Sequence, residues 1–102
     1  MNTVKDELVR RAEARTHAES KVVYIAQAAH EAERTHALAY SHQPALPKWE
    51  EAQAWVHVRA VDSVRRILSG AGPSENATSR ENLFYEVALA MATACNVEVQ
   101  RR

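Results

Sequence analysis

Two short stretches of the chain carry residues whose types and spacing suit ligand or metal binding. The first is His-Glu-Ala-Glu-Arg at positions 30–34. A zinc-protease helix needs His-Glu-x-x-His, because side chains four residues apart share a helix face and both imidazoles can reach one metal ion. Arg34 stands in place of the second histidine, so we expect no metal there. His30, Glu33 and Arg34 remain candidates for contacts with an anionic or polar ligand, and the alternative is a solvated helix face.

The second stretch is Pro-Lys-Trp-Glu-Glu-Ala-Gln-Ala-Trp at positions 47–55, which holds both tryptophans of the chain. Six helical residues turn through about 600°, so Trp49 and Trp55 are predicted to point about 120° apart. One indole can then be buried while the other flanks a groove and stacks on a planar ligand. The alternative is that both indoles anchor the core. Glu50 and Glu51 directly follow the first tryptophan.

No catalytic arrangement is present in the sequence. Nucleophilic catalysis needs a serine or cysteine beside an activating base, and the single cysteine, Cys95, is expected to be a small buried hydrophobe. The Ser-Gly-Ala-Gly-Pro-Ser stretch at 69–74 lacks the lysine of a phosphate loop. The remaining histidines have no ligand spacing for a metal: they are His17, His36, His42 and His57. We therefore predict a protein that is not an enzyme and has no metal or cofactor.

Three helical segments are predicted to position these residues. The two glycines and three prolines fall in two clusters, at 41–49 and 69–79. No stretch between them alternates in the manner of a strand, whereas apolar residues recur at helical spacing. The predicted helices run from about Thr3 to Tyr40, from about Pro47 to Ser69 and from about Ser79 to Val97.

The residues at the ends of the second predicted helix are of types that favour the start or the end of a helix. Pro47 suits a first turn because its φ is fixed and its missing donor is not needed there. Glu50 and Glu51 would lie near the positive end of the helix dipole. Gly70 is placed to end the helix.

The predicted fold is a single all-α domain, a small antiparallel bundle of three to four helices. Residues 1–20 are charged throughout and are predicted to form a separate helix or an arm. Residues 21–97 are predicted to form the helical core. Thr78 and Glu81 have the spacing of a capping box before the last helix.

Composition limits the partners of the chain. Its 102 residues include 13 basic and 13 acidic ones, and a balanced charge gives no reason to bind long nucleic acid or a membrane surface. The 46% hydrophobic content includes many alanines, so a monomeric core would be thin and homo-oligomerisation is expected to supplement it. With one cysteine and no apolar signal core or membrane span, the expected compartment is the cytoplasm.

The two stretches, with Ala-Val-Asp-Ser-Val-Arg-Arg-Ile-Leu at 60–68, resemble the ryanodine-receptor-type (RyR) repeat domain. That family has a His-Glu-Ala-Asn-Arg-like helix, a Pro-Trp-Glu-Glu-Ala-Pro-x-Trp segment and a further helix in the same order. The resemblance covers roughly residues 22–83. Glu33 replaces the favoured asparagine, Gln53 replaces a proline, and the later Gly-Trp and His-Pro segments are absent, so the chain is similar to a shortened bacterial or phage form.

The resemblance implies a non-enzymatic module that recognises a nucleotide-like ligand or a protein partner. The matching positions are His30, Glu31, Arg34, Trp49, Glu50, Glu51 and Trp55. An arginine among them suits bidentate binding of a phosphate, and a tryptophan suits stacking on a base. The alternative function is a structural or regulatory helical protein that acts through homo-oligomerisation.

Overall fold

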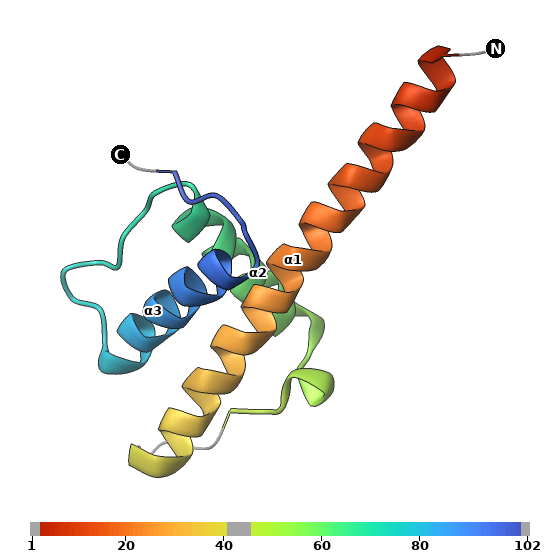
Figure 1. The fold of residues 1–102 in the computed structure, drawn as a ribbon. Coiled ribbons are helices and arrows are strands. Elements are labelled where there is room, and N and C mark those ends of the chain that lie inside the picture. Colours follow the sequence, from red (N-terminus) through yellow and green to blue (C-terminus); the bar gives the residue numbers. More distant parts are fainter. Residues whose placement is uncertain (1–2, 41–45, 101–102) are drawn as a thin grey trace.

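The computed structural model describes the chain as a small helical bundle. It covers residues 3–40 and 46–100, and side chains are described for these residues except 3, 13–17 and 40. The elements in chain order are α1 (Thr3–Tyr40), the 3₁₀ turn η1 (Trp49–Glu51), α2 (Ala54–Leu68) and α3 (Ser79–Ala94) (Figure 1). The described residues are 76% helical, and none of them lies in a strand, which confirms the predicted all-α fold.

The first predicted segment is one continuous helix of 38 residues. Such a helix is about 57 Å long, which accounts for most of the 62 Å maximum extent of the molecule. α2 and α3 pack on its second half, while its first half projects from the body (Figure 1). The described side chains of residues 4–20 are all exposed, and burial begins with the half-buried Lys21. The charged N-terminal region is therefore the first half of α1.

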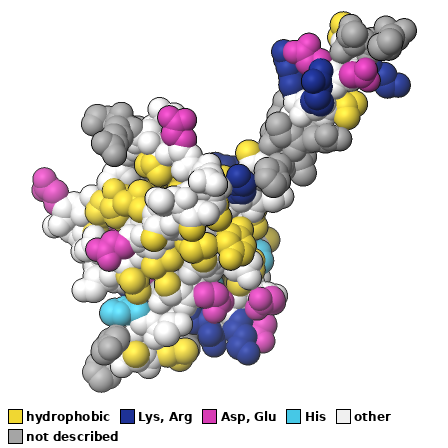
Figure 2. Space-filling model, viewed as in Figure 1, with side chains coloured by type: hydrophobic (Ala, Val, Ile, Leu, Met, Phe, Trp, Pro, Cys, Tyr) yellow, Lys and Arg dark blue, Asp and Glu magenta, His cyan; other side chains and the backbone are white. Residues whose placement is uncertain are grey.

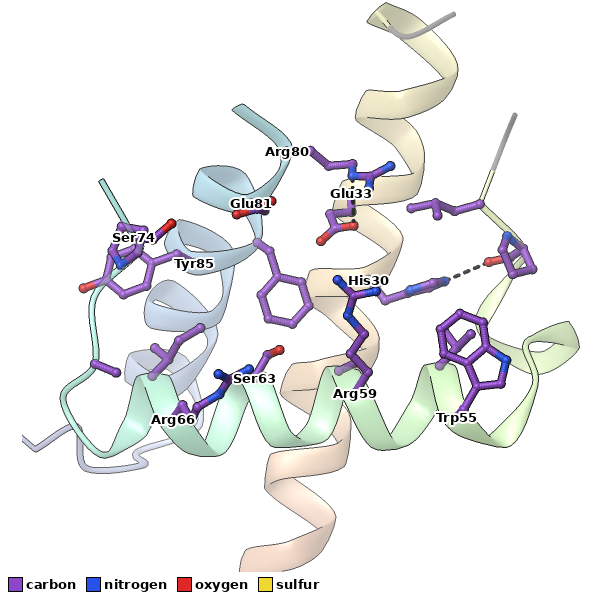
Figure 3. Close-up of a pocket in the computed structure, with 18 of the residues that line it drawn as sticks. His30, Glu33, Trp55, Arg59, Ser63, Arg66, Ser74, Arg80, Glu81 and Tyr85 are labelled. Atoms are coloured by element: carbon purple, nitrogen blue, oxygen red, sulfur yellow. Dashed lines mark hydrogen bonds and ion pairs between the residues drawn. The ribbon is translucent and has the colours of Figure 1, made fainter. Parts of the chain in front are cut away.

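The core lies where α2 and α3 meet the second half of α1. Ile25 and Val64 are its largest fully buried side chains. Most of the other core positions are alanines, whose small side chains let the helices approach closely. α3 runs opposite to α1, whereas α2 lies across α1 (Figures 1 and 3).

The helix ends follow the predicted capping residues. Gly70 has a φ of 101°, and its N–H donates to Ile67 O while the next N–H donates to Arg66 O, which is a Schellman arrangement. Thr78 Oγ1 accepts from the N–H of Glu81 at 3.1 Å. The last helix ends at Ala94, where Asn96 takes a φ of 56° and closes a second Schellman turn.

The prediction for the start of the second helix is wrong. α2 begins at Ala54, because Ala52 and Gln53 are extended, with ψ of 144° and 157°. Glu50 and Glu51 belong to the separate turn η1, so they do not lie in the first turn of α2. Contacts between α1 and residues 46–49 hold that segment against α1 and out of line with α2. These tertiary contacts override the local helical preference.

A pair of valines on α2 tests where the core lies. Val64 is fully buried, whereas Val58 is 58% exposed. Val64→Ala is expected to lower the free energy of unfolding by about 2 kcal/mol through lost burial and a cavity. This corresponds to a melting temperature lower by about 10 °C in calorimetry. Val58→Ala, the matched control, should change the free energy by less than about 0.5 kcal/mol. Equal losses from both variants would contradict the placement of α2.

Candidate functional site

Three side chains of α1 hold the connection that leads to α2, residues 46–53, which we call the strap. His30 Nε2 donates to Pro47 O at 2.8 Å. The carboxylate of Glu31 accepts from the N–H of Trp49 at 3.0 Å, and Arg34 Nε donates to Leu46 O at 3.2 Å. Glu31 and Arg34 also form an ion pair at 3.5 Å. The face is thus packed against the strap, and the alternative of a solvated helix face is wrong.

Trp49 fixes the strap from its other side. Its side chain is only 8% exposed and stacks on the ring of His57, with centroids 4.1 Å apart and an interplanar angle of 24°. His57 Nε2 also donates to Trp49 O. The ring of His30 meets the indole edge-on at 5.6 Å. Trp49 therefore lies between a histidine from α1 and one from α2, and it joins both helices to the strap.

Trp55 has the opposite environment. Its side chain is 61% exposed, and its Nε1 donates to Gln53 Oε1 at 2.8 Å. The interpretation with both indoles in the core is therefore wrong. The prediction of one buried and one exposed indole matches the structure, but the difference arises because the two residues lie in η1 and α2, which point in different directions.

A pocket of about 710 Å³ opens between α1, α2 and α3, and the strap and the connection from α2 to α3 complete its walls. Ala60, Ile67 and Phe84 give it an apolar floor. This volume is in the range of small-molecule sites. Of the predicted site residues, His30 and Trp55 line the pocket, as does Glu51. The other predicted site residues lie outside its lining: Glu31, Arg34, Trp49 and Glu50.

The wall formed by α2 carries aromatic and basic groups. Trp55, Arg59, Ser63 and Arg66 line the pocket (Figure 3), and their spacing of four, four and three residues places them along one helix face. Arg59 and Arg66 form no hydrogen bond or ion pair through their side chains with any residue that the structure describes. Arg59, Ser63 and Arg66 were not among the predicted site residues, although their helical spacing is visible in the sequence.

The wall opposite α2 carries two glutamates, and one of them forms an ion pair within that wall. Glu33 of α1 lies 3.4 Å from Arg80 at the start of α3 (Figure 3). Burial raises the pKa of Glu33, and the nearby charges of Arg80, His30 and Arg59 only partly oppose this. Glu81 also lines the pocket and lies in the first turn of α3, near the positive end of that helix. Among the arginines that line the pocket, those outside an ion pair with a described residue are therefore Arg59 and Arg66 of the α2 wall.

Other predicted features have no role in the pocket. Cys95 is half-buried at the end of α3 and packs against the core. No cluster of three or more metal-ligating side chains occurs among the residues described. His17 and His42 lie outside the described side chains. No helix in the described ranges is both long enough and apolar enough to cross a bilayer.

Comparisons with known proteins leave the family of the chain open. No family model matches the sequence, and neither the curated proteins nor the solved structures contain a match.

The burial of Glu33 predicts a pH-dependent stability. A raised pKa means that the folded state favours the protonated carboxyl, so this contribution is fully present below the unfolded pKa of about 4.3 and is lost as the pH rises through the folded value. The melting temperature of the wild type, measured relative to that of Glu33→Gln, is therefore expected to fall as the pH rises above the unfolded pKa of about 4.3. Glu86→Gln, at an exposed site on α3, serves as the control. Parallel profiles for the wild type and Glu33→Gln would contradict the burial.

Proposed function

We propose that the protein is a small non-enzymatic binding module of the RyR type, which recognises a nucleotide-like ligand in the pocket between its three helices. One observation carries the proposal. The exposed indole of Trp55 and the unpaired guanidinium of Arg59 lie one turn apart on the same face of α2, beside a pocket with an apolar floor. A ligand in which a planar ring is joined to an anionic group could stack on the indole and bind the guanidinium at the same time.

Trp55 is suited to stacking on a planar ring. An exposed tryptophan offers a large apolar face, and stacking of a base on an aromatic side chain contributes about 1–3 kcal/mol. The hydrogen bond from Nε1 to Gln53 fixes the orientation of the indole. Because the ring is already ordered, binding costs less conformational entropy than it would with a free side chain.

Arg59 is suited to binding the anionic group. Its side chain lines the pocket and forms no hydrogen bond or ion pair with a described residue, so a ligand need not displace an existing ion pair. A guanidinium binds phosphate through two parallel hydrogen bonds. Arg34, the arginine to which the resemblance assigns this role, donates instead to Leu46 O and pairs with Glu31.

The RyR-like residues support the proposal indirectly. His30, Glu31 and Arg34 bind the strap, and the strap leads directly into Trp55 and supplies part of the pocket wall. Their direct contact with a ligand stays a prediction. The geometry favours a role in positioning Trp55, because their polar atoms are already engaged.

Fluorescence titration with a nucleotide tests the proposal. Saturating AMP is expected to change the tryptophan emission and raise the melting temperature. Trp55→Phe should remove the emission change, and Arg59→Ala should weaken binding by about 10-fold or more through loss of a charge-assisted hydrogen bond. Arg65→Ala is the matched control on α2, since Arg65 pairs with Glu19 and Asp62 and does not line the pocket. Absence of any response to adenine, guanine, cytosine and uracil nucleotides would refute the proposal.

The projecting half of α1 supports homo-oligomerisation as a second candidate function. Val4 and Leu8 are 67% and 59% exposed there, among charged side chains of both signs (Figure 2). Both residues fall on the helical stripe that continues into the buried Ile25 and Ala29. Most helical stability in proteins comes from tertiary packing of an apolar face, so contact with another copy would stabilise this half of α1.

Light scattering tests this second candidate. The expected mass at micromolar concentration is a multiple of that of one chain, and Leu8→Glu is expected to reduce it to the monomer, because a charge would enter the contact. Thr93→Glu, at an exposed site on α3, is the control and should leave the mass unchanged. A wild-type monomer at all concentrations up to about 100 μM would rule out this candidate.

A further inference from the structure

The α2 wall of the pocket presents its groups in a fixed order. From the N-terminal end they are an indole, a guanidinium, a hydroxyl and a second guanidinium, supplied by Trp55, Arg59, Ser63 and Arg66 (Figure 3). At 1.5 Å per residue the row from Trp55 to Arg66 is about 16 Å long. The two arginines alone are about 10 Å apart along the helix axis.

From this order we infer that the ligand is a nucleoside polyphosphate that lies along α2, with its base at Trp55 and its phosphate chain extending past Arg59 and Ser63 to Arg66. The inference rests on the proposed function and adds to it the number of phosphates. Arg59 meets the phosphate nearest the nucleoside, and Arg66 meets only the phosphates farther along the chain. The pocket therefore distinguishes nucleotides by phosphate number.

The charges around the pocket favour this direction of binding. The side chains of Arg59 and Arg66 form no hydrogen bond or ion pair with any described residue, although the charge of Arg59 also acts on Glu33, so each guanidinium can bind one anionic group. The carboxylate of Glu33 is paired with Arg80, and Glu81 lies in the first turn of α3, where the helix dipole offsets its charge. A phosphate chain would consequently follow the α2 wall, where each added phosphate gains a contact.

Ser63 and the connection from α2 to α3 line the end of the pocket that is farther from Trp55. Ser63 is half-buried between the two arginines and offers a hydroxyl that donates to a phosphate oxygen. Ala71, Gly72 and Ser74 of the connection also line the pocket. A Cβ built on Gly72 would meet nothing within 4 Å, so this part of the wall leaves open space for the end of a polyphosphate chain.

Calorimetric titration of the full chain with AMP, ADP and ATP tests the inference. In the wild type the dissociation constant for ATP is expected to be lower than that for AMP by about 10-fold or more. This is the gain in affinity that one charge-assisted hydrogen bond gives. Arg66→Ala should abolish this gain and leave AMP binding unchanged, and Arg66→Lys should restore part of it. Arg59→Ala should weaken all three nucleotides by the same factor. Arg65→Ala, next in sequence but outside the pocket, should behave as the wild type.

The possible results separate the two proposals. Equal affinity of the wild type for AMP and ATP, or equal weakening of AMP and ATP by Arg66→Ala, overturns the phosphate-counting site while the nucleotide module stands. Absence of binding by all three nucleotides overturns both. Inorganic tripolyphosphate, which has no base, should bind more weakly than ATP and should be unaffected by Trp55→Phe. Tripolyphosphate binding as tight as that of ATP would show that the base does not contribute, and would overturn the inferred order of contacts.

Discussion

The structure depends on three hydrogen bonds between α1 and the strap. His30, Glu31 and Arg34 bind the backbone at Pro47, Trp49 and Leu46. A connection with only one 3₁₀ turn must satisfy many of its backbone polar groups in some other way, and here side chains of α1 supply partners. Because the strap is held in this position, Trp49 is inserted between His30 and His57, and α2 begins only after a change of direction.

This arrangement lets a small domain combine a stable core with an open pocket. Among the described residues the core is made largely of alanine, and its large aromatic side chains are those of Trp49 and Phe84. A buried polar group lowers the stability of a fold unless it forms a hydrogen bond. Among the described residues no buried side-chain nitrogen or oxygen lacks a partner. Trp49 therefore serves the core, while Trp55, six residues later, remains available at the pocket.

Local features of the fold were predictable, and the pocket was not. The helical spacing, the terminator Gly70 and the cap Thr78 act through neighbours in sequence, so the sequence reveals them. The start of α2 was missed because Pro47 and the following glutamates look the same before an α-helix as before a 3₁₀ turn. The free side chains of Arg59 and Arg66 depend on how α2 lies across α1, which no local pattern specifies. The RyR-like residues marked the strap that positions the pocket wall, and the pocket itself lies beside it.

The most direct test of this account is the amide hydrogen exchange rate of Trp49, measured by NMR. Its N–H donates to the Glu31 carboxylate and to no backbone carbonyl among the described residues. The account predicts exchange slowed by about 100-fold or more relative to an unstructured chain, since opening this contact requires the strap to leave α1. It also predicts loss of that protection in Glu31→Ala, with the amides in the middle of α3 unaffected. Exchange of the Trp49 amide at the unstructured rate in the wild type would contradict the account.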